Sequence, residues 1–201
     1  GAFVVERDMP GVETGPPMKK MGMHASPTGE LFLQDVEVGT DRLLGGSARA
    51  SQRSSAKSSL SSERFGMVPM CLGIVDRCLE LAVEHAKTRE QWGRPIAEFQ
   101  LVQAKLAEMY VARSVMFMML LRQLEADHKR VALPPEEASA AKLYAARKAT
   151  EVALDAVQVL GGSGYMQGSV VEMLARDAKL LQIGGGTDEI QTLQIARQLL
   201  R

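Results

Sequence analysis

The sequence predicts a mainly α-helical fold, an up-and-down bundle of the four-helix type that is preceded by a few β-strands from an incomplete β-domain. Two observations predict it. From about residue 61 to the C-terminus, apolar residues recur at spacings of three and four, which is the period of one helical face. In the first 45 residues, short apolar runs are instead separated by turn-forming residues, as they are between strands.

The strand-like region covers residues 1–45. AFVVE (2–6) and ELFLQDVEV (30–38) are rich in apolar and β-branched residues, and GMHASPTGE (22–30) contains turn formers. We expect two or three short strands here, which are too few to be stable alone. The region is therefore interpreted as the C-terminal part of a middle β-domain. Residues 46–62, rich in Ser and Ala, form either a linker or the approach to a helix.

The bundle domain covers residues 63–201. Its helices are predicted at about 61–88, 98–130, 134–160, 170–183 and 187–201. Gly93 and Pro95 separate the first two helices, Pro134 and Pro135 mark the start of the third, and Thr187 is a plausible N-cap. On the second helix we expect a buried stripe formed by Leu101, Leu106, Met109, Val115, Leu120 and Leu124.

Composition argues against several classes of protein. Lys plus Arg and Asp plus Glu each number 24, so the chain has no general attraction to nucleic acid or to an anionic membrane. Its longest apolar run, VMFMMLL, is too short to span a bilayer, no signal peptide is recognised, and no metal-ligand spacing is present. Cys71 and Cys78 would lie about 10 Å apart along one helix, too far for a disulfide. We expect both to be buried thiols in a reducing compartment.

Four short motifs are unusual for a plain helical bundle. They are SSERFG (61–66), TREQWGRPI (88–96), QVLGGSGY (158–165) and RDAKLLQIGGGTDEIQ (176–191). Each glycine cluster can also be interpreted as a helix C-cap followed by a turn, and the charges of the second motif as a solvated turn. The occurrence of all four motifs in this order on one bundle favours a functional interpretation.

Together with KMGMHASPTGELFLQDVEV (20–38), these motifs resemble the C-terminal half of the acyl-CoA dehydrogenases. The resemblance covers nearly all 201 residues and is weakest at 47–62. It implies a FAD-dependent oxidoreductase of fatty acid metabolism. Such an enzyme removes a proton from the α-carbon of an acyl-CoA thioester and transfers a hydride from the β-carbon to flavin N5.

Removal of the α-proton requires a carboxylate base in a dry site and donors at the thioester oxygen. Most members of the family carry this base as a glutamate before the GT of the last motif, where this sequence has Gly185. A minority, resembling the isovaleryl-CoA and long-chain branches, carries it on the first C-terminal helix, directly before an arginine. Glu63 and Arg64 form that pair, so we expect Glu63 to be the base. Alternatively, Glu63 is an acid that favours the helix dipole, with Ser61 or Ser62 as the cap.

The resemblance also implies roles for the remaining site residues. Gly185 would offer its N–H to the oxyanion, and Gly186 would permit close approach of the backbone to the acyl-CoA. Arg64 would lie near the CoA-bearing substrate. FAD contacts are expected from Arg89, Gln91, Trp92, Gln100, Gln158, Gly161, Gly162, Thr187 and Glu189, with Arg89 supplying positive charge to the phosphates.

In the family these FAD contacts reach a neighbouring subunit, so the resemblance implies a homo-oligomer, either a dimer or a tetramer. It also implies electron-transferring flavoprotein as a partner, and a location in the bacterial cytoplasm or the mitochondrial matrix. The family's N-terminal helical domain and early strands would precede Gly1, so we expect these residues alone to be inactive. Two alternatives are a non-catalytic subunit or fragment that acts as an assembly module in a flavoprotein complex, and a helical interaction module without flavin.

Overall fold

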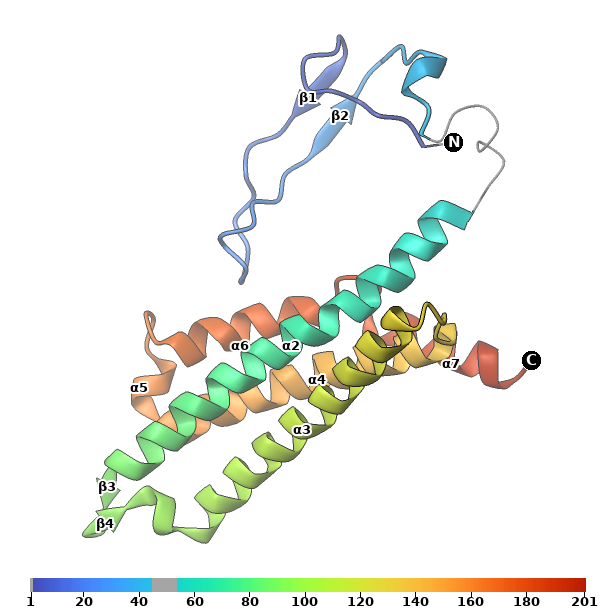
Figure 1. Cartoon of the computed structure of the whole chain (residues 1–201). Coiled ribbons are helices and arrows are strands. Elements are labelled where there is room, and N and C mark those ends of the chain that lie inside the picture. Colours follow the sequence, from blue (N-terminus) through green and yellow to red (C-terminus); the bar gives the residue numbers. More distant parts are fainter. Residues whose placement is uncertain (1, 45–53) are drawn as a thin grey trace. The chain divides into compact units, whose positions relative to one another are not determined.

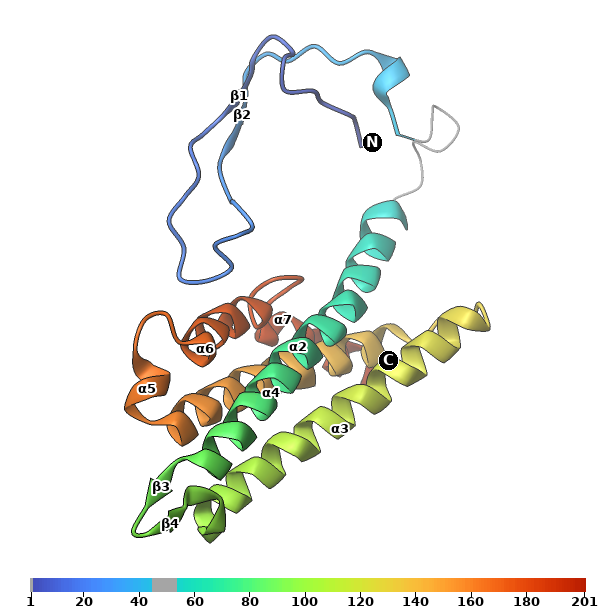
Figure 2. The same ribbon diagram turned by 60° about the vertical axis from the view of Figure 1, so that its left-hand side comes forward.

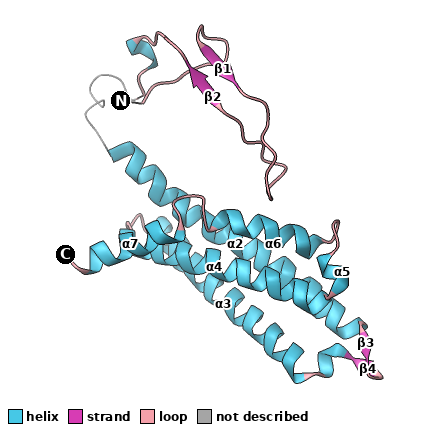
Figure 3. Ribbon diagram, turned by 180° about the vertical axis from the view of Figure 1, so that it is seen from behind, coloured by secondary structure: helices cyan, strands magenta, loops and turns pink. Residues whose placement is uncertain are grey.

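The structure is a computed structural model that describes residues 2–44 and 54–201, with the backbone alone for 54–62. Its contacts divide the chain into two compact units, Gly1–Leu60 and Ser61–Arg201. Helices dominate the second unit, and the described strands are short (Figure 3). The predicted mainly α-helical fold class is confirmed. Residues 45–53, in the predicted linker, lie outside the described part of the chain.

In the first unit, β1 (Val12–Thr14) pairs antiparallel with β2 (Leu31–Leu33). The expected strand at AFVVE is wrong, because only Phe3 forms a bridge there, with Leu43. Gly11 explains the position of the pairing. It has a φ of 83°, and its carbonyl accepts a hydrogen bond from the N–H of Gln34, which aligns the residues after Gly11 with β2.

In the second unit, three long helices lie side by side with alternating direction (Figures 1 and 2). They are α2 (Ser54–Thr88), whose residues 54–60 are counted with the first unit, α3 (Gln100–His128) and α4 (Pro135–Leu160). The short strands β3 (Glu90–Gln91) and β4 (Arg94–Pro95) form a hairpin between α2 and α3. After α4 come the single turn α5 (Gly162–Tyr165) and two shorter helices, α6 (Val170–Leu181) and α7 (Asp188–Leu199). Helix α4 is central, since it packs against α3, α6 and α7.

Small side chains allow close packing around α4. Its buried face carries alanines, among them Ala138, Ala145 and Ala149, at spacings of three, four and seven. From α2, Cys71 and Cys78 are completely buried and unbonded to each other, as predicted. Burial raises the pKa of each thiol to about 12. These cysteines are therefore neutral packing residues at physiological pH.

The predicted buried stripe of α3 is wrong at its ends. Met109 is completely buried, but the side chain of Leu101 is 84% exposed and that of Leu124 is 53% exposed. Helix α3 carries apolar residues on more than one face, so their spacing does not define a single buried side. Ala112 and Met116 continue the stripe that packs.

None of the described helices has both the length and the apolar character needed to cross a bilayer. Within residues 2–44 and 54–201, no three His, Cys, Asp or Glu side chains lie close enough together to bind a metal ion.

Candidate active site

The glycine loop, residues 184–187, joins α6 to α7. Gly185 has a φ of 61° and Gly186 a φ of 98°, both in the region that favours glycine. The N–H of Gly184 bonds to the last turn of α6, at the carbonyl of Leu180. Thr187 is the N-cap of α7, because its hydroxyl accepts a hydrogen bond from the N–H of Ile190, as the sequence predicted. The loop is therefore a tight turn between two helices.

The side of the loop at Gly185 faces α2. A methyl group built on Gly185 would lie 2.9 Å from the sulfur of Met67 and 3.8 Å from the carboxyl carbon of Glu63. The carboxyl group of Glu63 thus lies beside the space that a side chain at position 185 would occupy. This proximity joins residues from two motifs that are far apart in the sequence.

Contacts within the chain itself explain why position 186 is a glycine. A methyl group built on it would lie 2.7 Å from the amide nitrogen of Gln191, a completely buried residue on α7. Close approach of a ligand is therefore not required to explain a glycine here.

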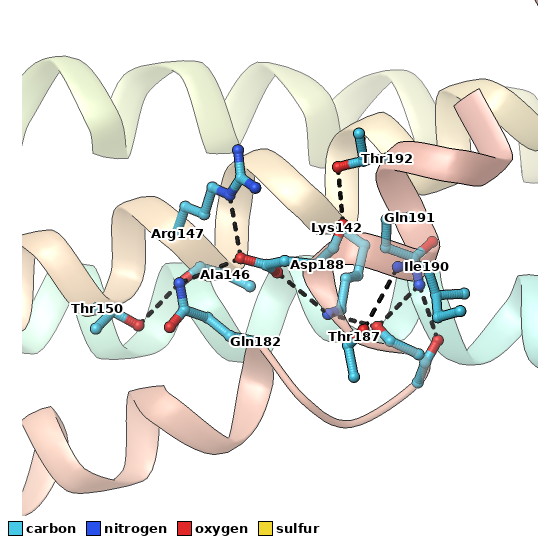
Figure 4. A network of polar contacts seen from close by, with 12 residues as sticks. Lys142, Ala146, Arg147, Thr150, Gln182, Thr187, Asp188, Ile190, Gln191 and Thr192 are labelled. Atoms are coloured by element: carbon cyan, nitrogen blue, oxygen red, sulfur yellow. Dashed lines mark hydrogen bonds and ion pairs between the residues drawn. The ribbon is translucent and has the colours of Figure 1, made fainter. Parts of the chain in front are cut away.

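Two carbonyl groups of the loop accept hydrogen bonds from the buried side chains of Lys142 and Gln191, which Figure 4 shows. The Gln191 amide donates hydrogen bonds of 3.0 Å to the oxygens of Gly185 and Gly186. The Lys142 ammonium, on α4, donates one of 2.9 Å to the Gly186 oxygen. Among the described residues, the N–H of Gly185 has no hydrogen-bond acceptor. It is therefore available to a bound ligand.

Charged groups tie the loop to α4 (Figure 4). The Lys142 side chain is completely buried, and its Nζ lies 3.8 Å from Oδ1 of Asp188, the first residue of α7. Oδ2 of Asp188 accepts a 3.0 Å hydrogen bond from Arg147, also on α4. Burial lowers the pKa of Lys142, and the Asp188 carboxylate opposes that effect. The start of α7 is thus fixed against α4 by an ion-pair network.

The other predicted residues near the loop are less buried. Glu63 and Glu189 are exposed, and Arg64 is half-buried. The pKa of Glu189 is lowered by hydrogen bonds from its own N–H and from the Thr187 hydroxyl. Nε of Arg64 is buried and has no acceptor among the described residues. Arg64 therefore keeps a hydrogen-bond donor at this end of α2.

A second group of predicted residues surrounds the β3–β4 hairpin. Arg89, Gln91 and Gln100 are exposed, and the side chain of Trp92 is 90% exposed. Trp92 (φ 56°) and Gly93 (φ 77°) form a two-residue turn with positive φ at both positions, as in a type I′ hairpin. A tryptophan in this region of backbone space is uncommon. The hairpin thus presents a large aromatic surface away from its own chain.

The α4–α5 turn completes this second group. Gly161 has a φ of 61° and is the C-cap of α4, so a turn alone accounts for a glycine there. A methyl group on Gly161 or Gly162 would meet no atom within 4 Å, and Gln158 is exposed. Gly164 differs, because a methyl group on it would lie 2.8 Å from Cβ of Leu160. Gly164 is a packing glycine, whereas Gly161 and Gly162 face open space.

The structure separates the predicted cofactor residues into two groups. The hairpin and the α4–α5 turn lie at the same end of the bundle, here named the hairpin end (Figures 1 and 2). Thr187 and Glu189 lie at the glycine loop instead. Helix α6, with 12 residues, lies between the two groups along the chain and is about 18 Å long.

Comparison with known proteins identifies the family. The family profile described as "Acyl-CoA dehydrogenase, C-terminal domain" matches residues 53–200. The chain belongs to the acyl-CoA dehydrogenase family. It is 40% identical over 201 residues to a probable acyl-CoA dehydrogenase of Bacillus subtilis (strain 168), covering 100% of this chain and 52% of that protein.

Two further relatives extend the comparison. The chain is 37% identical over 204 residues to a mitochondrial isovaleryl-CoA dehydrogenase of Oryza sativa subsp. japonica, covering 100% of this chain and 48% of that protein. A glutaryl-CoA dehydrogenase of Mycobacterium smegmatis in complex with FADH2 has the same fold, with a TM-score of 0.91 at 29% identity. That match covers 98% of this chain and 50% of the other. The chain spans about half the length of the curated relatives it matches.

Sequence reasoning missed the side chains that hold the glycine loop, above all Lys142, Gln191 and Asp188. One signal was present. Lys142 follows Ala138 by four residues and precedes Ala145 by three, so it lies on the same helical face as buried alanines. A lysine in such a stripe indicates a buried charge with a specific partner.

Proposed function

We propose that this chain is the catalytic C-terminal part of a FAD-dependent acyl-CoA dehydrogenase in which Glu63 is the base. One observation carries the proposal: the carboxyl carbon of Glu63 lies 3.8 Å from the position of a side chain at Gly185. Glycine cannot supply the base that most relatives carry at this position. A carboxylate from α2 beside the same space supports the alternative origin of that group.

The residues of the loop support the proton-transfer half of the reaction. The α-C–H bond of the thioester breaks, its proton passes to a carboxylate oxygen of Glu63, and negative charge develops on the thioester oxygen. The free N–H of Gly185 is the donor that we assign to that oxygen. Arg64 and Gly186 are the proposed contacts to the substrate, and the unpaired Nε of Arg64 fits such a role.

The exposed residues of the hairpin end fit FAD. Arg89 offers an exposed cation for a pyrophosphate, Trp92 an aromatic face, and the open space at Gly161 and Gly162 would let backbone approach a ligand. The full proposed set is Arg89, Gln91, Trp92, Gln100, Gln158, Gly161, Gly162, Thr187 and Glu189. Glu189 is an anion, so we assign it to hydrogen-bond donors of the cofactor and not to its phosphates. When bound, FAD supplies the acceptor for the hydride that leaves the β-carbon.

Association of chains is part of the proposal, because the two groups of cofactor residues are separated within one chain. Helix α3 exposes Tyr110, Val111, Phe117 and Met118, an apolar surface that supports a homodimer or homotetramer. We propose electron-transferring flavoprotein as the redox partner and a bacterial cytoplasmic or mitochondrial matrix location. The position of the base favours branched or longer acyl chains, in keeping with the isovaleryl-CoA dehydrogenase relative.

The test uses the purified protein that contains this chain. We expect absorbance in the flavin bands, and anaerobic addition of branched or long-chain acyl-CoA should bleach it. A colourless protein that does not bind added FAD would contradict the proposal and favour the alternative of an assembly module. A flavoprotein that no acyl-CoA bleaches would favour a non-catalytic subunit.

A further inference from the structure

We propose that Lys142 is a positioning residue that holds the peptide group between Gly186 and Thr187 and so keeps the glycine loop, which carries the Gly185 N–H, in one conformation. This inference rests on the proposed function, because it concerns the loop whose Gly185 N–H is assigned to the thioester oxygen. It assigns a task to a buried charge on α4 that lies outside the predicted site.

The burial of Lys142 requires an explanation. Its side chain has no exposed surface and lies on the alanine-lined face of α4. Removing an ammonium group from water costs several kcal/mol unless it is paired, and an apolar side chain would fill the same space without that cost. The described hydrogen bond of the ammonium goes to the Gly186 oxygen, at 2.9 Å. Its partners are therefore the backbone of the glycine loop and, at 3.8 Å, the Asp188 carboxylate.

Because the peptide group is planar, a contact that fixes its C=O group also fixes the direction of its N–H group. In a trans peptide, the C=O and N–H groups point in opposite directions. With the Gly186 oxygen held by Lys142 and also by the Gln191 amide, the N–H of Thr187 points away from these two side chains. The Gln191 amide holds the Gly185 oxygen, which directs the N–H of Gly186 in the same way. Two buried side chains thus set the orientation of two successive peptide groups.

The loop needs these hydrogen bonds because its own residues restrict its backbone conformation very little. Glycine has more accessible backbone conformations than any other residue, so three in succession would sample many orientations. No side chain is present on Gly184, Gly185 or Gly186 to restrict them by packing. Lys142 replaces that missing restraint by a charge-assisted hydrogen bond, which is stronger than a neutral one.

The direction of the Lys142 side chain is itself determined by its charged neighbours. Asp188 on α7 attracts the ammonium from 3.8 Å and is held by Arg147. From α2, Arg64 repels it, and the Cys71 thiol is neutral below its pKa of about 12. The attraction to Asp188 and the repulsion from Arg64 therefore act together to fix the ammonium at the start of α7.

The first test measures loop order without any need for catalysis. In the purified protein that contains this chain, Lys142→Met should lower the backbone 15N order parameter of Thr187, whose N–H belongs to the peptide group that Lys142 holds, from about 0.85 to below about 0.6. The matched control is Lys148→Met on the same helix. The Lys148 ammonium pairs with Glu151, and this substitution should leave the Thr187 order parameter unchanged. A Thr187 amide that stays rigid in Lys142→Met would overturn the proposal, whatever the effect of the substitution on melting temperature.

The second test uses the flavin-loaded protein that contains this chain. Because the loop that Lys142 holds carries the N–H donor assigned to charge that develops in the transition state, Lys142→Met should lower kcat at least about tenfold with KM little changed. Lys148→Met should stay within about twofold of the wild type. A Lys142→Met enzyme with full kcat would contradict the inference. If the wild type itself catalyses nothing, the proposed function fails while the order parameters still decide the role of Lys142.

A third measurement applies if Lys142→Met does not fold. In the unsubstituted protein, the 13C resonance of the Gly186 carbonyl and the 15N resonance of the Thr187 amide should titrate with the midpoint of the Lys142 ε-carbon. Titration of Lys142 without any movement of these two resonances would overturn the proposal.

Discussion

At the glycine loop, the peptide groups are held by buried side chains of the same chain, whereas at the hairpin end the corresponding residues are exposed. The Gly185 and Gly186 carbonyls bond to Lys142 and Gln191, both completely buried. Trp92, at the tip of the hairpin, has 90% of its side-chain surface exposed. The two regions belong to one proposed site but differ in what completes them.

This difference indicates two ways of building a site. The part that we propose for the reacting thioester is held by a buried polar network, as electrostatic stabilisation of a transition state requires. The part assigned to the cofactor depends on a ligand or a second chain for its contacts. Substitutions at the loop should therefore change the stability of the chain, and substitutions at the hairpin end should change affinity alone.

The largest effect on stability is expected from Gly186→Ala. Alanine is strained at a φ of 98°, and its methyl group would lie 2.7 Å from the amide of Gln191. We expect a loss of about 1–3 kcal/mol in the free energy of unfolding, measured by denaturant titration. Gly162→Ala is the control, because a methyl group there meets nothing within 4 Å. Equal losses for both variants would remove the proposed distinction between the two regions.

A smaller effect, and one of a different kind, is expected from Arg89→Gln. Arg89 is exposed, so the unfolding free energy of the FAD-free chain should not change. Loss of a charge-assisted contact to the phosphates should raise the Kd for FAD about tenfold, and the difference should shrink at high salt. Arg77→Gln, an exposed residue of α2 that pairs with Glu80, is the control. An unchanged Kd would remove Arg89 from the cofactor site.

The smallest effect is expected in the pH dependence of stability. Burial lowers the pKa of Lys142 in the folded state below its ordinary value of 10.5. Between these two pKa values the unfolded chain binds more protons, so the free energy of unfolding should rise with pH. The rise should appear in the difference in unfolding free energy between the wild type and Lys142→Met. Both proteins carry the same two cysteines, so the contribution of the thiols cancels in this difference. If the difference falls with pH instead, the pKa of Lys142 is raised in the folded protein, which would contradict this prediction.

The sequence predicted the helices well because their apolar spacing, prolines and N-cap are local signals. Thr187, for example, caps α7 as expected. It predicted the buried stripe of α3 less well, because Leu101 and Leu124 are apolar, as buried residues usually are, but lie on exposed faces. The proximity of Glu63 to Gly185 followed from the family resemblance and not from any local pattern.

The side chains that hold the glycine loop could not be predicted from the sequence, for a different reason. Lys142 and the Gly186 carbonyl that it holds are 44 positions apart, and a backbone carbonyl carries no side-chain signature. Only the spacing of Lys142 within buried alanines indicated its burial, and that pattern does not identify a partner. Tertiary packing of α4 against α7 supplied the missing information.

The most direct measurement compares anaerobic flavin bleaching by acyl-CoA in Glu63→Gln and Glu84→Gln. Glutamine keeps the size of the side chain beside Gly185 but cannot accept the α-proton. We predict a fall of about 10²–10⁴-fold in the bleaching rate for Glu63→Gln, the usual contribution of a general base. Glu84→Gln, an exposed glutamate on the same helix, should bleach at the wild-type rate. Bleaching of Glu63→Gln at the wild-type rate would contradict the assignment of Glu63 as the base.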